Sequence, residues 1–216
     1  MGMGSRTLGV AWGGSLAAVG VIGLAIGGGM GYQPEGMGDH GGMMGGAQPE
    51  MDEMMEAMMK AGTPNEHHRA LDVMAGDWTT EAWFAMAPGA PRDEHEGTAH
   101  NEWLMGGRYL GTSYEGKFGG MPFEGHGVMG YDNINGNYFT GWIDSMSTGL
   151  LLDKGQMSAD GKTLTMGSEM KDPMGNMVKT RSVTRIESKD RHVMEFWHAG
   201  PDGEFAKVGE IAFTRR

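Results

Sequence analysis

Turn signals at roughly ten-residue intervals divide the chain from Asp77 onward into short segments in which polar and apolar residues alternate. The dividers combine Gly with Asn, Asp or Pro, as at Ala159-Asp160-Gly161 and Gly200-Pro201-Asp202-Gly203. This pattern is typical of an antiparallel sandwich or barrel. It predicts strands over residues 77–86, 96–105, 108–118, 122–132, 137–146, 149–157, 163–171, 177–187, 191–199 and 204–214.

The loops between these predicted strands are short, which favours an up-and-down meander. Closing the meander removes exposed edge strands. We therefore predict an all-β, antiparallel up-and-down barrel of about ten strands, wide enough to hold a small ligand. A short helix should precede it, because Thr63-Pro64-Asn65-Glu66 is typical of a helix start, with Thr63 as the cap. That helix should end near Gly76.

Residues 1–30 form an apolar N-terminal segment, with Arg6 followed by an uncharged stretch from Thr7 to Met30. The pattern is typical of an export signal, and an uncleaved membrane anchor is the alternative. The chain has no cysteine, which excludes disulfides, thiolate metal sites and lipid attachment through an N-terminal cysteine. We expect a periplasmic or secreted protein whose contact with the membrane is through this segment alone.

Residues 31–62 form a Gly- and Met-rich linker that contains a short amphipathic helix over residues 51–60. Methionines recur there at i, i+3, i+4, i+7 and i+8, which is one face of a helix. One hypothesis is a helix that packs on the domain or binds a protein partner, with Met as an adaptable apolar residue. The other is Cu(I) capture by thioethers together with His40.

The composition restricts the function further. A formal net charge of −11 without clustered Lys or Arg excludes a nucleic-acid partner. The chain contains no Gly-x-Ser-x-Gly and no His-Glu-x-x-His motif, so we predict no catalytic residues and no cofactor. His100, His126 and His198 would form a metal or haem site only if they converged. His100 shares a face with Glu102 and His126 with Glu124, which indicates outward-facing positions and therefore no metal site.

The predicted strand 137–146 presents an unusual face. Tyr138, Thr140, Trp142 and Asp144 point the same way, because strand side chains alternate with period two. Aromatic rings beside one carboxylate suit a cavity wall, and a buried Asp144 would need a partner such as Arg108 or Arg181. A turn-capping role for Asp144 is the alternative. The predicted ligand-binding residues are Trp103, Tyr131, Trp142, Asp144 and Arg181.

Several ordered motifs together resemble the bacterial family of unknown function called DUF1579. The resemblance covers about residues 64–214 and excludes the Met- and Gly-rich segment. The motifs are His67-x-x-Ala70-Leu71, Met74-Ala75-Gly76-Asp77-Trp78, Trp103-x-x-Gly106-Gly107-Arg108-Tyr109-Leu110, Glu115-Gly116, Pro122-Phe123-Glu124-Gly125, Gly130-Tyr131-Asp132 and Trp142-x-Asp144-Ser145-x-Ser147-Thr148-Gly149.

The resemblance implies a lipocalin-like, calycin-type barrel over residues 63–216 and no established activity. The wider superfamily shares a Gly-x-Trp near the first strand and an Arg near the last, which correspond to Gly76-Asp77-Trp78 and to Arg215 or Arg216. The implied arrangement is that the N-terminal helix and Trp78 plug one barrel end, with the Arg stacked over the indole.

Three functions remain open from the sequence. The leading expectation is an exported, non-catalytic barrel that binds a small, partly apolar ligand in its interior. The second is an enzyme on the same barrel that uses Asp144 with Arg181 or a histidine. The third is an interaction or Cu(I)-handling protein that acts through helix 51–60.

Overall fold

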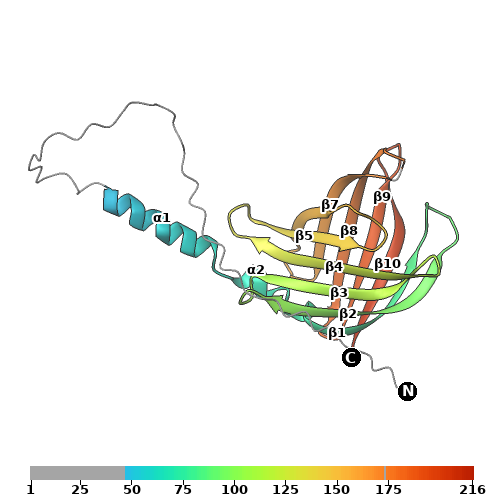
Figure 1. Ribbon diagram of the computed structural model, residues 1–216, viewed down its shortest axis with the longest axis horizontal. Helices are drawn as coiled ribbons and strands as arrows, with labels where there is room; N and C mark the ends of the chain where they lie inside the picture. Colours follow the sequence, from blue (N-terminus) through green and yellow to red (C-terminus); the bar gives the residue numbers. More distant parts are fainter. Residues whose placement is uncertain (1–46, 173) are drawn as a thin grey trace, which may run out of the picture. The chain divides into compact units, whose positions relative to one another are not determined.

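The computed structural model describes residues 47–172 and 174–216, in which ten strands follow three short helical segments (Figure 1). The helical segments are α1 (Ala47–Ala61), α2 (Glu66–Arg69) and the 3-10 helix η1 (Asp72–Met74). The strands are β1 (Gly76–Phe84), β2 (Asp93–Leu104), β3 (Tyr109–Phe118), β4 (Met121–Asp132), β5 (Asn137–Asp144), β6 (Leu151–Met157), β7 (Thr163–Lys171), β8 (Met177–Ser188), β9 (Arg191–Ala199) and β10 (Phe205–Arg215). The predicted export segment 1–30 and residues 31–46 lie outside the described residues.

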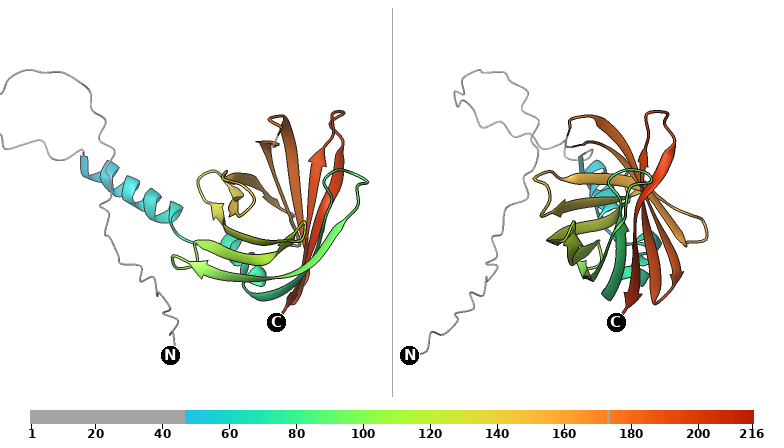
Figure 2. Two further views of the ribbon diagram at one scale, coloured as in Figure 1. Left: turned by 45° about the vertical axis from the view of Figure 1, so that its right-hand side comes forward. Right: turned by 90° about the vertical axis from the view of Figure 1, so that its right-hand side faces the viewer.

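The strands form one closed antiparallel barrel in which each strand pairs with the next along the chain. β1 closes the barrel on β10, in a register that runs from Trp78 opposite Arg215 to Phe84 opposite Gly209. β2–β5 run across the direction of β7–β10 (Figures 1 and 2). The predicted up-and-down meander of ten strands with a short N-terminal helix is confirmed.

Element boundaries differ from the predicted ones where pairing continues past a turn signal. β2 begins at Asp93 rather than at residue 96, because its pairing with β1 extends to Phe84 opposite Asp93. β6 begins at Leu151 rather than at residue 149, after the loop that follows Asp144. The Met-rich helix is longer than residues 51–60 and begins at Ala47.

The predicted helix cap at Thr63 is wrong. Thr63 Oγ1 donates a hydrogen bond of 2.6 Å to the Met59 carbonyl at the end of α1. The cap of α2 is Asn65, whose side chain accepts from the backbone N–H of His67. The helix ends at Arg69, and the chain reaches β1 through the separate turn of η1.

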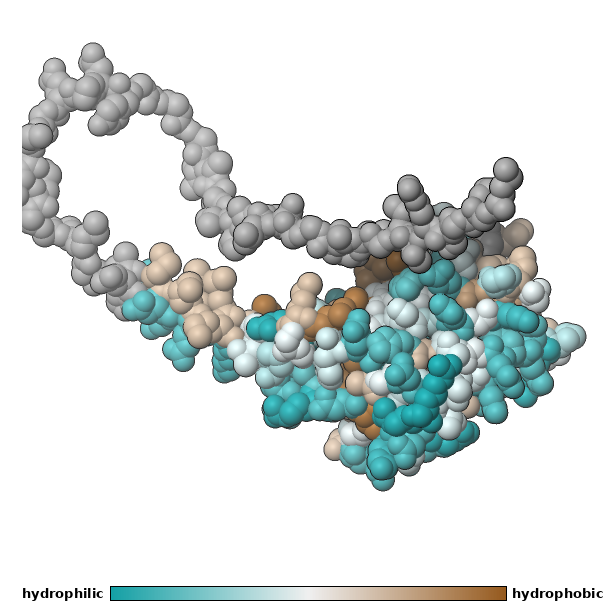
Figure 3. Space-filling view, turned by 60° about the horizontal axis from the view of Figure 1, so that its bottom comes forward, coloured by the Kyte–Doolittle hydropathy of each residue, from teal (hydrophilic) through white to brown (hydrophobic). Residues whose placement is uncertain are grey.

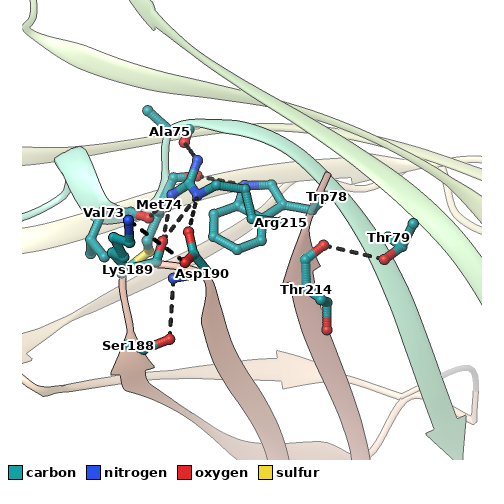
Figure 4. A network of polar contacts seen from close by, with 10 residues as sticks. All are labelled: Val73, Met74, Ala75, Trp78, Thr79, Ser188, Lys189, Asp190, Thr214 and Arg215. Atoms are coloured by element: carbon teal, nitrogen blue, oxygen red, sulfur yellow. Dashed lines mark hydrogen bonds and ion pairs between the residues drawn. The ribbon is translucent and has the colours of Figure 1, made fainter.

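The closed end of the barrel is built around the indole of Trp78, which is fully buried. Trp78 Nε1–H donates to the Met74 carbonyl at 3.0 Å, and the Arg215 guanidinium stacks 4.2 Å from the Trp78 ring (Figure 4). Arg215 also donates to the carbonyls of Val73 and Ala75 at 2.8 and 2.7 Å. Of the two candidate arginines, Arg215 therefore makes the implied contact and joins η1 to the last strand.

Two packed clusters of buried side chains form the hydrophobic core. The first brings Leu71 and Met74, beside α2, against β3, β5 and β7. The second surrounds Trp78 with side chains of β1, β2, β3 and β10. Five side chains of these clusters also line the interior site described next, namely Met74, Leu110, Tyr114, Ile211 and Phe213.

Candidate functional site

A cavity of about 340 Å³ occupies the barrel interior. This volume lies in the range of small-molecule sites. Its wall is dominated by aromatic, aliphatic and thioether side chains, interrupted by a few polar groups. The lining residues include Phe84, His95, Asn101, Leu110, Tyr114, Phe118, Phe123, Met129, Thr140, Trp142, Asp144, Leu151, Asp153, Thr184, His192, Met194, Phe196, Ile211 and Phe213.

Trp142 forms one wall of the cavity because two glycines of β4 leave room for its indole. A Cβ built on Gly125 would lie 2.1 Å from Trp142 Cζ2, and one built on Gly127 would lie 2.7 Å from Trp142 Cε3. The ring therefore packs directly against the β4 backbone. The glycine spacing in β4 determines how far the indole reaches into the cavity.

Asp144 lies beside Trp142 in the cavity wall and is held at both carboxylate oxygens. Trp142 Nε1–H donates to Oδ2 at 3.1 Å, and the backbone N–H of Met146 donates to Oδ1 at 2.9 Å. Asp144 thus orients the wall tryptophan and also caps the following turn. The turn-capping role that the sequence offered is therefore present, and a ligand-anchoring role for Asp144 stays a prediction.

A second carboxylate, Asp153 on β6, also lines the cavity. Its backbone pairs with that of Thr140, and its Oδ1 is buried without a hydrogen-bond partner among the described residues. Burial raises the pKa of the Asp153 carboxyl, and a hydrogen bond with the Ser168 side chain acts in the opposite direction. The site thus has a carboxylate that a ligand can still engage.

Two nearly buried polar side chains contribute to the cavity near Trp78. Asn101 is 7% exposed, and its Nδ2 donates to the Met74 carbonyl at 2.7 Å, which leaves Oδ1 without a partner in the described chain. His192 is 4% exposed and stacks 4.3 Å from Phe213, and its Nδ1 has no partner there either. Burial, aided by the charge of Arg215, lowers the pKa of His192 to about 4, so its ring is neutral at physiological pH.

The five predicted ligand-binding residues fall into three places. Trp142 and Asp144 line the cavity. Trp103 and Tyr131 pack against the first buried cluster, where Trp103 Nε1–H donates to Asp72 Oδ1 and Tyr131 stacks on His67.

Arg181 has a different position from the predicted one. It is exposed, it stacks 3.9 Å from the Phe205 ring, and it lies on the β8 face opposite to the cavity-lining Thr184. The structure therefore does not bring Arg181 to Asp144, and the indole of Trp142 and the backbone of Met146 take the place of the expected cation.

Sequence reasoning did not identify Asp153, Asn101 or His192. Period-two alternation along β2 and β9 places Asn101 and His192 on the inward faces of these strands. This alternation is the one sequence signal of their orientation. Asp153 alternates with the exposed Leu152 and Lys154, so the same rule places it inside. None of the three belongs to a recognisable motif, and their shared location depends on barrel closure.

The histidines considered as metal ligands do not converge. His100 contacts Asp77 at 2.7 Å, and His126 contacts Glu124 at 3.0 Å and the Ser113 hydroxyl at 3.2 Å, all among exposed side chains. Over residues 47–172 and 174–216, no three His, Asp or Glu side chains are grouped to hold a metal ion.

None of the helices described is long and apolar enough to cross a bilayer.

A closed ten-stranded antiparallel barrel with an aromatic-lined interior cavity is the class of protein that this fold and site define. Residues 63–215 match the family described as "Protein of unknown function (DUF1579)". The chain belongs to this family, and the resemblance noted in the sequence motifs is confirmed.

Solved structures of other barrels align with most of this chain at low identity. The S-type phycobiliprotein lyase CPES from Guillardia theta aligns at 10% identity over 71% of this chain and 98% of that one, with a TM-score of 0.49. A redesigned β-barrel, mFAP1, bound to DFHBI aligns at 15% identity over 68% and 99%, with a TM-score of 0.36. A search of curated proteins returns no match.

Proposed function

We propose that this chain binds a small, partly apolar molecule inside the barrel and does not act as an enzyme. The observation that carries the proposal is the cavity of about 340 Å³ that is walled by aromatic and Met side chains and contains a few polar groups. Such a composition favours an apolar ligand body and fixes its orientation through a small number of polar contacts.

The polar atoms of the cavity that have no partner indicate which chemical group the ligand presents to them. Asp153 Oδ1 and Asn101 Oδ1 are hydrogen-bond acceptors without a donor among the described residues. A buried polar atom of this kind is costly until a donor reaches it. A ligand with a hydroxyl, amide or amine group would supply that donor and would gain affinity at these positions.

The catalytic alternative loses one of the two partners that it offered for Asp144, namely Arg181. It required Asp144 to act with Arg181 or a histidine, and Arg181 lies on the outer face of β8. Asp144 is occupied by the Trp142 indole and the Met146 backbone. We also propose that binding takes place outside the cytoplasm, as the export pattern of residues 1–30 suggests.

Blocking the cavity tests the binding proposal directly. Thr140→Trp places a large ring inside the barrel, whereas Thr79→Trp places the same ring on the exposed outer face of β1. We expect the interior variant to lower the affinity for the neutral dye Nile red at least tenfold and the outer variant to leave it unchanged. Native mass spectrometry of the protein purified from its own cells should show an extra mass that denaturation releases and that Thr140→Trp abolishes.

Equal dye affinity in the wild type and in folded Thr140→Trp would contradict the proposal. Circular dichroism of each variant establishes that the barrel has formed before binding is compared.

A further inference from the structure

The methionines of α1 are exposed to solvent and do not pack on the barrel. Their exposed fractions are 61% for Met51, 62% for Met54, 51% for Met55, 61% for Met58 and 70% for Met59. The hypothesis of a helix that packs on its own domain therefore does not account for them. In Figure 3, tan apolar side chains are visible along α1 beside teal hydrophilic ones.

These five methionines, which we call the methionine face, occupy one side of the helix. Their spacing of i, i+3, i+4, i+7 and i+8 places neighbouring Cβ atoms about 5–6 Å apart. The acidic residues Asp52, Glu53 and Glu56 fall on the remaining part of the helix surface. The side chains of Met51, Met54, Met55 and Met58 therefore surround one point on the helix surface. Each of these side chains has enough rotatable bonds to direct its sulfur toward that point.

The exclusive use of methionine on this face says more about the role of α1 than its hydrophobic pattern does. From Glu50 to Ala61 every large apolar residue is Met, whereas the buried clusters of the barrel use Leu, Trp, Tyr, Phe and Ile as well. An ordinary apolar docking face has no requirement for sulfur at every position. Thioether sulfur is a soft ligand that selects Cu(I) over Zn(II) or Mg(II), and it carries no proton that the metal must displace.

We propose that the methionine face of α1 is a binding site for a soft monovalent metal ion, Cu(I). Three or four thioethers from Met51, Met54, Met55 and Met58 hold the ion, and Met59 extends the set through its neighbour Met55. The chain has no cysteine, so thiolates do not compete for the ion. The flanking carboxylates of Asp52, Glu53 and Glu56 favour a cation electrostatically. This site is separate from the proposed ligand cavity.

The test compares two variants of the full chain that each replace five exposed methionines by leucine. The helix variant carries Met51→Leu, Met54→Leu, Met55→Leu, Met58→Leu and Met59→Leu. The matched control carries Met86→Leu, Met121→Leu, Met146→Leu, Met174→Leu and Met177→Leu, which are also exposed positions but lie outside α1. Leucine matches methionine in helix propensity and apolar character, so only the thioethers are lost.

Cu(I) affinity is measured without oxygen by competition with the chromogenic chelator bicinchoninate. We expect the helix variant to bind Cu(I) at least tenfold more weakly than the wild type, and the control variant to stay within twofold of it. The cavity variant Thr140→Trp should bind Cu(I) as the wild type does. Full binding by the helix variant, or an equal loss in the helix and control variants, would overturn the proposal.

A second measurement locates the ion by residue. Ag(I) is a redox-inert ion of similar softness, and a coordinated thioether is protected from oxidation by peroxide. Peptide mapping should show that Ag(I) suppresses sulfoxide formation at Met51, Met54, Met55 and Met58 but not at the exposed Met86 or Met174. Zn(II) should give no protection, and equal protection at all exposed methionines would overturn the assignment.

Discussion

Trp142 is the residue on which the geometry of the cavity depends most directly. Its indole rests on the backbone of Gly125 and Gly127 and donates its N–H to Asp144. Residue alternation in β5 was sufficient to predict that Trp142 and Asp144 share an inward face. It was insufficient to identify the partner of Asp144, because that partner is a neighbour on the same strand face and not a distant cation.

Adding one methyl group under the indole should therefore be costly. In Gly125→Ala the new Cβ would meet Trp142 Cζ2 at 2.1 Å, whereas in Gly141→Ala the nearest atom is 3.6 Å away. We expect Gly125→Ala to lower the free energy of unfolding by about 2 kcal/mol, as overpacked sites do. Gly141→Ala should change it by less than about 0.5 kcal/mol. Urea unfolding measures both, and similar losses in the two variants would contradict this account of the wall.

At the scale of elements, the closed end of the barrel is held by contacts among η1, β1 and β10. Arg215 contacts the Trp78 ring, two carbonyls of the η1 region, the Lys189 carbonyl and the Asp190 carboxylate (Figure 4). The resemblance predicted an arginine here but left two candidates. The helix start was misplaced, because Thr63 and Asn65 are both good caps. In the structure Thr63 bonds to the Met59 carbonyl, and Asn65 forms the capping box with His68.

The planar guanidinium makes these contacts simultaneously, which an ammonium group does not. Arg215→Lys should lower the free energy of unfolding by about 2 kcal/mol, because one partly buried carbonyl or more loses its donor. Arg216→Lys is the matched control, since Arg216 contributes a backbone hydrogen bond to Asp77 and its side chain is exposed. Hydrogen exchange at the amides around η1 should rise in the first variant only. An unchanged exchange rate there would show that Arg215 does not hold this end.

For the whole molecule, regular turn spacing was enough to predict ten strands and a closed meander. It was not enough to predict the contents of the interior. Asn101, His192 and Asp153 come from β2, β9 and β6, and they face one space only after the barrel has closed. These three residues share no local sequence pattern, so the sequence of each strand alone does not predict that their side chains meet.

Acid should destabilise the barrel through His192. Its pKa is about 4 in the folded state and about 6.5 in an unfolded chain, so between these values the unfolded state binds a proton that the folded state does not. The contribution of His192 to the free energy of unfolding should therefore be constant above pH 6.5. It should fall by up to about 3 kcal/mol as the pH drops toward 4.

The variant His192→Phe isolates this contribution. Unfolding free energies measured from pH 7 to pH 4 should fall less steeply for His192→Phe than for the wild type. Thr79→Phe, which places the same ring on the exposed outer face of β1 and removes no titratable group, should keep the wild-type slope. The depressed pKa of Glu195, about 2 because of hydrogen bonds from Arg185 and Lys207, adds a further loss below pH 4.5 in all three proteins. Parallel curves for His192→Phe and the wild type would refute the assignment.

The pairing of β1 with β10 also affects the order of folding. Trp78 lies opposite Arg215, so β1 pairs with a strand that is synthesised more than a hundred residues later. Every other pairing joins two strands that are consecutive in the sequence. Loop closure over such a distance is entropically costly, which makes this step a late and slow one. During synthesis β1 has one edge without its final partner, and an unpaired edge is a template for another chain. The interval before closure is therefore when this protein is most open to misassembly.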